Sequence, residues 1–436
     1  MNKKNFTCLC ILAALLVLGS FLLRSDFMVF LRWYLMFLIL GTGLFPFTSF
    51  LFDPFEDHGW MFSKVIATAV GGYITWLFVT GGLQQFTSRR CVVITLILFG
   101  ICWFYFTGKP YRRKPKLDLI LVEEVIFLAA LLLWTYVFCF RPEAYGTEKF
   151  MDYGFLVSME RSIELPAKDM WYGLSHINYY YGGQYFTVYL SKLSYLPVRY
   201  TYNLMRAAVA AFAFVLPFSI VYHLLRSRLH DLPRSAGWST AGGCIAGAAV
   251  SLAGNLHYVL YGLFGRLFRL EGYESYWFPS STRYIGHNPP VAGDECIHEF
   301  PSYSFVLGDL HAHMLNIIFV LTILGVLYCW IRRVRRLELA RIEQERIRQE
   351  QQLHRPSKFK GEKSWKIFLR RNGVEAPLIL AGGLVGLCKF TNYWDYVIYF
   401  TVTAFVCAMV AMYRYYDSPV RAVGSVALHM AEVWVI

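Results

Sequence analysis

An aspartate and two histidines lie within five residues of one another, directly before a long apolar segment. The stretch is FPSYSFVLGDLHAHMLNIIFV, residues 300–320, and its ionisable side chains are Asp309, His311 and His313. Ionisable groups at the mouth of an apolar run are costly to place there without a partner or a function. Carboxylate and imidazole ligands suit a divalent transition metal, and phosphate contact by the histidines is the alternative. We therefore predict a site for a divalent metal ion or a phosphate here.

The local backbone decides which of these three side chains converge. If residues 308–313 are extended, Asp309, His311 and His313 alternate onto one face. If they are helical, Asp309 and His313 align and His311 points away. Two of the three can converge in either conformation, and the sequence leaves both open.

Two carboxylates form a second candidate site in the segment GTEKFMDYGF. Glu148 and Asp152 are four residues apart, so on a helix both share one face. Such a pair suits metal binding or general-base catalysis, where a carboxylate accepts a proton from the reacting group. The alternative is a helix start, at which acidic side chains are stabilised by the positive end of the helix dipole.

Two further stretches combine aromatic and polar side chains. The first is NYYYGG, residues 178–183, and the second is TNYWDY, residues 391–396. The tyrosines fit a segment at the membrane interface or an aromatic belt, and the glycines permit close approach of a ligand or another helix. We assign substrate contacts to seven of these residues: Asn178, Tyr179, Tyr180, Tyr181, Asn392, Trp394 and Asp395.

The composition indicates that lipid is the solvent for much of the chain. Of its 436 residues 56% are hydrophobic, and the mean hydropathy is +0.41, whereas soluble domains are about 45–50% apolar. Apolar runs near the roughly 20 residues that cross hydrocarbon recur along the chain. We predict an all-α, polytopic helical bundle of about ten to eleven transmembrane helices. The runs cover residues 2–23, 27–52, 61–83, 91–107, 119–140, 202–225, 237–264, 314–331, 374–390 and 397–413.

The distribution of lysine and arginine predicts the topology. It places the N-terminus in the cytoplasm and two large loops, 141–201 and 265–313, outside, in a multi-pass protein of the cell membrane. Glu148, Asp152, Asp309 and Asp395 then all fall on the extracytoplasmic side. Polar residues from separated stretches on one side are what a single site between helices requires.

The chain divides into four predicted parts: N-terminal transmembrane helices (1–140), a core with both outer loops (141–331), a basic cytoplasmic insert (332–372) and C-terminal transmembrane helices (373–436).

The basic insert carries nine of the 13 net positive charges. This concentration favours a cytoplasmic loop over nucleic-acid binding. We expect it to begin as a solvated helix with ion pairs such as Glu338 with Arg341 and Glu345 with Arg348. Its first arginines suit anionic lipid headgroups, and a plain topological anchor is the simpler reading. The final apolar run, 423–436, is too short to cross, so we expect the chain to be cut off, or naturally truncated, within a helix.

Four motifs occur in series: EKFMD (148–152), INYYYGG (177–183), EFPSYSFVLGDLHAH (299–313) and TNYWDY (391–396). In this order they resemble the YYY-motif family of uncharacterised multi-pass membrane proteins. That family is similar in architecture to the GT-C superfamily of integral membrane glycosyltransferases. The resemblance implies a GT-C-like fold and transfer of sugar from a polyprenyl-phosphate donor at the outer face.

By the same resemblance, Asp152 or Glu148 is the catalytic base, and Asp309, His311 and His313 lie near a metal ion or the lipid phosphate. The chain departs from the GT-C pattern because five predicted spans precede its first large outer loop. Two alternatives stay open: a transporter or lipid flippase that uses the same groups as a translocation path, and a metal-dependent phosphoesterase.

Overall fold

The computed structural model describes residues 2–108, 114–146, 148–269, 277–283, 285–287, 290–354 and 364–436. Secondary structure in these ranges is helical, apart from two isolated bridges, Lys168 with His176 and His287 with Pro290. The prediction of an all-α fold is therefore confirmed. Residues 355–363 of the basic insert lie outside the described ranges.

The chain begins with five long helices, and helices of very different length follow them. The elements are α1 (Lys3–Leu23), η1 (Arg24–Asp26), α2 (Phe27–Leu51), α3 (Trp60–Thr80), α4 (Ser88–Phe106), α5 (Leu117–Phe138), α6 (Lys149–Arg161), α7 (Gly182–Ser194), α8 (Val198–Arg228), α9 (Ser235–Ser251), η2 (Tyr258–Phe264), α10 (Gly265–Phe268), η4 (Phe278–Thr282), α11 (Pro301–Leu307), α12 (Ala312–His354), α13 (Ser364–Arg371), α14 (Ala376–Thr391), α15 (Tyr393–Arg414) and α16 (Pro419–Val435).

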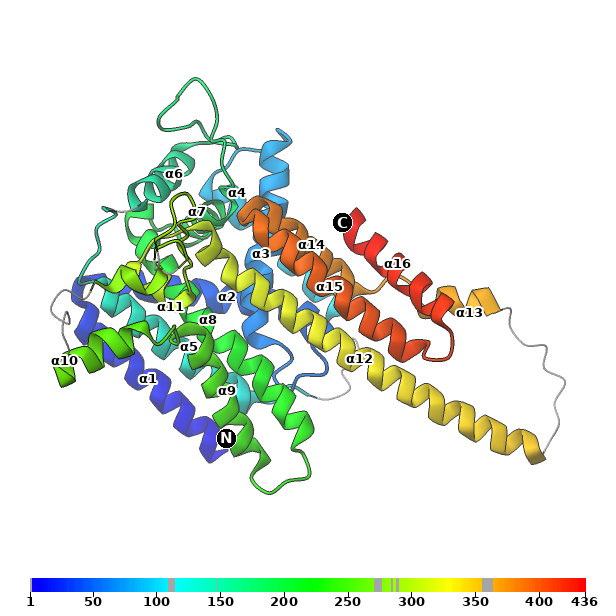
Figure 1. Cartoon of the computed structure of the whole chain (residues 1–436). Helices are drawn as coiled ribbons and strands as arrows, with labels where there is room; N and C mark the ends of the chain where they lie inside the picture. Colours follow the sequence, from blue (N-terminus) through cyan, green and yellow to red (C-terminus); the bar gives the residue numbers. More distant parts are fainter. Residues whose placement is uncertain are drawn as a thin grey trace.

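Helix α12 runs diagonally through the molecule (Figure 1). It packs against α14 and α15 on one side and against α8 on the other, and α8 in turn packs against α5 and α9. The short helices α6, α7 and α11 gather near the N-terminal end of α12. Its C-terminal half extends away from the bundle. The long span thus connects two different ends of the protein.

Helix α7 lies inside the bundle, although it falls in the segment 141–201 that was expected to be an outer loop. Almost every residue of Gly182–Ser194 is buried, because seven helices surround it, namely α2, α3, α4, α6, α8, α12 and α14. Its neighbour α8 carries buried alanines at most positions from 207 to 213, and these small side chains let adjacent helices approach closely. The outer segment therefore folds back as packed structure.

The number of membrane spans differs from the expected ten or eleven. Within the described residues, six helical segments are long and apolar enough to cross a membrane: Lys3–Leu51, Trp60–Thr80, Ser88–Phe106, Val198–Arg228, Ala312–Ile347 and Tyr393–Arg414. Part of the difference is that α1 and α2 are joined through η1 into one long segment. In addition, α9, α14 and α16 have only 16 or 17 residues, fewer than the roughly 20 that span hydrocarbon.

The basic insert begins as predicted, because α12 continues without a break from the apolar span to His354. The expected pairing of Glu338 with Arg341 is wrong. Glu338 instead contacts Arg371 of α13 at 2.5 Å, and Arg341 pairs with Glu345 at 2.9 Å. The side chain of Arg348 lies outside the described part of the structure.

Basic side chains from several loops gather at the end of the bundle opposite α6 and α7. Glu56 contacts Lys116 at 2.8 Å and Arg226 at 3.5 Å, and Lys4 contacts Asp118 at 2.9 Å. These are the segments that the charge distribution places together on one side of the membrane. That this side is cytoplasmic stays a prediction.

Gly182 and Gly183 serve helix packing. A Cβ on Gly182 would lie 2.6 Å from the Phe390 carbonyl oxygen, and one on Gly183 would lie 2.6 Å from Leu315. We expect Gly182→Ala to lower the free energy of unfolding by about 1–3 kcal/mol, because the carbonyl cannot move away without shifting α14. Gly386→Ala is the matched control, since nothing lies within 4 Å of its Cβ and alanine favours a helix. Unfolding in detergent measures both, and equal stability of the two variants would contradict this packing role.

Candidate active site

Three carboxylates surround one imidazole at the end of the bundle that carries α6 and α7. His311 Nε2 lies 2.7 Å from Glu148 Oε2. His311 Nδ1 lies 3.4 Å from Asp152 Oδ2 and 3.9 Å from Asp309 Oδ2. Residues about 160 positions apart in the sequence therefore meet in one cluster, defined as Glu148, Asp152, Asp309 and His311. We call it the outer acidic cluster, after the side of the membrane that the sequence predicts for it.

The backbone before α12 brings Asp309 and His311 to the same side. Gly308 ends α11 in the left-handed region with φ 78°, a conformation that glycine adopts at little cost. Residues 309–311 are outside any helix, and α12 begins at Ala312. The segment is thus non-helical up to His311 and helical from Ala312 on, so Asp309 and His311 do not share one helix with His313.

The inner carboxylates of the cluster are held from the bundle core. Gln184 of the buried helix α7 donates to Asp152 Oδ1 at 2.9 Å. The positive charge of the Arg206 guanidinium group on α8 attracts the Asp309 carboxylate. The Cζ atom of Arg206 lies 4.0 Å from the Phe138 ring centre. Asp152 is 1% exposed. Its orientation is therefore fixed by packing and hydrogen bonding.

Two buried atoms of the cluster lack a hydrogen bond within the described residues, namely Asp152 Oδ2 and His311 Nδ1. They face each other at 3.4 Å, an ion-pair distance. Buried polar atoms in native structures usually have a hydrogen-bond partner, and exceptions often mark functional positions. Glu148, in contrast, has a side chain that is 58% exposed and opens the cluster to solvent.

The charge of His311 is set by its neighbours. Burial by itself lowers the pKa of this imidazole, but Asp152, Asp309 and Glu148 outweigh it and raise the pKa to about 9. At neutral pH the ring is therefore an imidazolium ion, with a carboxylate near each nitrogen. The cluster thus places one imidazolium ion among three carboxylates.

This pKa predicts how stability depends on pH. A pKa raised from 6.5 to about 9 corresponds to about 3 kcal/mol of stability that is complete below pH 6.5 and is lost as the pH rises through 9. We expect unfolding experiments between pH 6 and pH 10 to show this loss in the wild type and in His230→Gln, which alters an exposed histidine. His311→Gln should lack it, and an unchanged pH dependence in that variant would contradict the assignment.

His313 belongs to a neighbouring group. Its Nε2 lies 3.1 Å from Glu299 Oε2, and Ser304 Oγ lies 3.0 Å from the same carboxylate oxygen. Burial raises the pKa of Glu299, but His313 and Ser304 lower it more strongly, so that it lies below its usual range. The ring centres of His311 and His313 are 5.6 Å apart. The two groups are therefore adjacent, and His313 pairs with Glu299.

The three tyrosines have different environments. Tyr179 and Tyr180 stack at 4.2 Å, and burial, Tyr180 and the charges of Asp152 and Glu148 raise the pKa of Tyr179. Tyr181 is buried and accepts a hydrogen bond from Trp76 Nε1 at 3.2 Å. Tyr179 and Tyr180 thus border the outer acidic cluster, whereas Tyr181 is part of the core. Asn178 is exposed.

The residues of the TNYWDY motif form a separate polar group. Asp395 accepts hydrogen bonds from Asn316 Nδ2 at 2.6 Å and from Asn392 Nδ2 at 2.8 Å. Thr391 donates to Asn316 Oδ1 at 2.6 Å. Trp394 is 74% exposed. The contacts of Asp395 and Asn392 thus join the starts of α12 and α15, and in the described part of the structure they include no residue of the outer acidic cluster.

Sequence reasoning missed Gln184, Arg206 and Glu299. A signal was available for Arg206, because an arginine within an apolar span indicates a functional or ion-paired position. Gln184 follows the two glycines of the NYYYGG motif, and no local pattern shows that it faces Asp152. Such a contact depends on how α6 and α7 pack.

Chemically, the cluster combines one exposed carboxylate, two buried carboxylates and a cation. A carboxylate can accept a proton, and an imidazolium can bind an anionic group. Within the described residues no group of three or more His, Cys, Asp or Glu side chains is arranged to hold a metal ion. The carboxylates and the imidazolium thus offer groups for proton transfer and for anion binding.

Comparison with known proteins gives one match. A family model described as "Uncharacterized membrane protein (DUF2298)" matches residues 70–435. The matched region contains the whole outer acidic cluster. No curated protein and no solved structure matches the chain.

Proposed function

The chain belongs to the DUF2298 family of uncharacterized membrane proteins, and we propose that it is a membrane glycosyltransferase that uses a polyprenyl-phosphate-linked sugar. The observation that carries the proposal is the outer acidic cluster, with His311 between Glu148, Asp152 and Asp309. The cluster lies at the head of a membrane-spanning helix, where a lipid-linked donor would present its phosphate. We propose that this side is extracytoplasmic.

The proposed reaction is an inverting transfer. The acceptor hydroxyl attacks the anomeric carbon and forms a new glycosidic bond, while the bond from that carbon to the phosphate oxygen breaks. The polyprenyl phosphate leaves with the electron pair. The proton of the hydroxyl passes to a carboxylate of the Glu148 and Asp152 pair.

The two carboxylates differ in what they can reach. Glu148 faces solvent, so it is the group that an acceptor can meet first, and Asp152 lies behind it on the same helical face. The imidazolium of His311 supplies the positive charge that the leaving phosphate requires. Tyr179 and Tyr180 border the same opening and offer aromatic faces to a sugar.

In a second form of this proposal, a divalent metal ion would supply the positive charge in place of the imidazolium. The oxygen atoms of Glu148, Asp152 and Asp309 and a deprotonated His311 are the donors that would hold it. The ion would neutralise charge on the donor phosphate. His313 would take part only after leaving Glu299.

Sugar transfer in proteoliposomes tests the proposal. Purified protein is supplied with radiolabelled polyprenyl-phosphate sugars and with membrane extract as the source of acceptor, with and without a chelator. The proposal predicts a labelled product that needs the donor on the side of the outer acidic cluster. If no donor gives a product, the proposal is contradicted. If the chelator abolishes the product, the reaction requires a metal ion.

A transporter or flippase is the second candidate, and one observation favours it. Asp57, Glu123 and His223 are buried, and His223 Nε2 lies 3.0 Å from Asp57 Oδ1. Ionisable groups buried in a membrane often belong to a translocation path. Movement of a labelled polyprenyl-phosphate sugar across the proteoliposome membrane without transfer to an acceptor would favour this candidate.

A further inference from the structure

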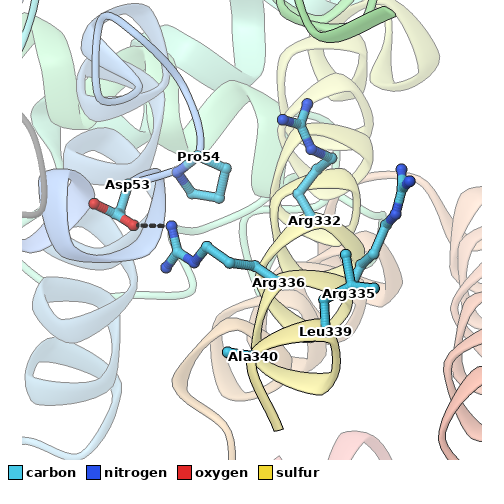
Figure 2. A pocket seen from close by; sticks show the side chains of 7 residues that line it. All are labelled: Asp53, Pro54, Arg332, Arg335, Arg336, Leu339 and Ala340. Carbon is cyan, nitrogen blue, oxygen red and sulfur yellow. Dashed lines mark hydrogen bonds and ion pairs between the residues drawn. The ribbon is translucent and has the colours of Figure 1, made fainter. Parts of the chain in front are cut away.

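A cavity lined by arginines lies where α12 leaves the apolar part of its span. It has a volume of about 540 Å³ and lies between the loop after α2 and the face of α12. Its charged lining residues are Asp53, Arg332, Arg335 and Arg336, and we call it the arginine pocket. Figure 2 shows these side chains around the opening.

The spacing of the arginines directs them to one side of the helix. Arg332, Arg335 and Arg336 follow an i, i+3, i+4 pattern, which places side chains on the same face. Arg336 crosses to Asp53, with a distance of 2.5 Å from Nη1 to Oδ2 (Figure 2). The pocket thus contains three guanidinium groups and one carboxylate.

Two of the arginines keep an uncompensated charge. Arg332 donates to the Tyr328 hydroxyl at 3.0 Å, a neutral partner. Among the ion pairs of the described residues, neither Arg332 nor Arg335 has a carboxylate partner. Asp53 neutralises only Arg336, so the pocket has an excess of two positive charges.

A neighbouring cavity enlarges the site. It has a volume of about 360 Å³, shares Pro54 and Arg332 with the arginine pocket, and is also lined by Arg226 and His230. Arg226 is already paired with Glu56. The second cavity therefore adds space next to Arg332 for the rest of a ligand.

The pocket lies far from the outer acidic cluster. Arg332 follows His311 by 21 positions of the same stretch, which is roughly 30 Å at 1.5 Å per helical residue. That distance equals the thickness of the hydrocarbon layer. The two sites thus belong to opposite boundaries of the membrane.

We propose that the arginine pocket binds a doubly charged phosphate group at the membrane boundary opposite the outer acidic cluster. Guanidinium groups present paired N–H donors that match phosphate oxygens, and two unpaired arginines match two negative charges. A purely topological anchor needs positive charge but no cavity. The phosphate can come from a lipid headgroup or from a soluble phosphorylated compound, and the inference is independent of sugar transfer.

Binding to the full chain in detergent at 150 mM salt tests this. The probes are inorganic pyrophosphate, dihexanoyl phosphatidic acid and, as a neutral lipid, dihexanoyl phosphatidylcholine. We expect the wild type to bind at least one phosphate probe at least tenfold more tightly than the double variant Arg332→Gln, Arg335→Gln. Binding of both phosphate probes indicates that the phosphate alone is recognised, and binding of phosphatidic acid alone indicates a lipid headgroup.

The matched control removes the same charge outside the pocket. Arg341→Gln with Arg346→Gln lies further along α12, where each arginine is paired with a glutamate of the same helix. This control should bind like the wild type, and unfolding without a probe should show that both double variants are folded. If the pocket variant is unstable, the exposed Arg335→Gln alone should still weaken binding. Equal affinity of the pocket and control variants, or no preference for phosphate over the neutral lipid, would overturn the proposal.

Discussion

Replacing Lys64 with Met should lower the free energy of unfolding by about 3–5 kcal/mol, because the substitution leaves Glu124 as a buried carboxylate without its cation. Lys64 and Glu124 form an ion pair between α3 and α5, and their side chains are 0% and 5% exposed. Tyr34 and Trp60 also donate to this carboxylate, at 3.0 Å and 2.6 Å. Unfolding of the purified protein in detergent measures the loss.

Lys4 provides the matched control. It also pairs with an acidic residue of α5, Asp118, but its side chain is 54% exposed. Lys4→Met should therefore cost at most about 1 kcal/mol. Adding Glu124→Leu to Lys64→Met should recover much of the stability, since no unpaired charge then remains. Similar losses for Lys4→Met and Lys64→Met would contradict a buried ion pair.

Sugar transfer should fall about 10²- to 10⁴-fold when the acidic pair of α6 is neutralised, which is the usual contribution of a general base. Glu148→Gln removes the exposed carboxylate, and Asp152→Asn removes the buried one. Asp309→Asn should have a smaller effect if its role is to hold His311. The initial rate of product formation in proteoliposomes measures all three.

The control for these variants is Glu164→Gln, which changes an exposed acid of the same outer segment. It should keep the wild-type rate. If Glu148→Gln and Asp152→Asn both keep the wild-type rate, neither carboxylate is the general base. A loss in Asp152→Asn alone, with unchanged KM, would assign the base to the buried carboxylate.

The sequence predicted the features that local patterns control. Apolar runs predicted a helical membrane protein, and the charge pattern after Arg332 predicted the solvated continuation of α12. Helical spacing placed Glu148 and Asp152 on one face. The positive charges of loops far apart in sequence were expected at one end of the bundle, and Glu56 joins two of them there.

What the sequence did not reveal depends on tertiary packing. A hydropathy pattern cannot show that seven helices pack against α7, or that Gln184 therefore meets Asp152. The pairing of His313 with Glu299 likewise follows from the position of α11. Asp395 was expected in the same pocket, yet Asn316 binds it at the junction of α12 and α15. Ten to eleven spans stay a prediction, because apolar composition does not fix where a helix ends and only six helical segments of the described residues are long and apolar enough to cross a membrane.

A structure bound to a phosphonate analogue of a polyprenyl-phosphate sugar tests the central claim most directly, because the analogue cannot undergo transfer. We expect the phosphonate to lie against His311 and the anomeric carbon to face Glu148. The polyprenyl chain should then run along the membrane-facing side of the bundle. An analogue bound elsewhere, with the outer acidic cluster open to solvent, would contradict it.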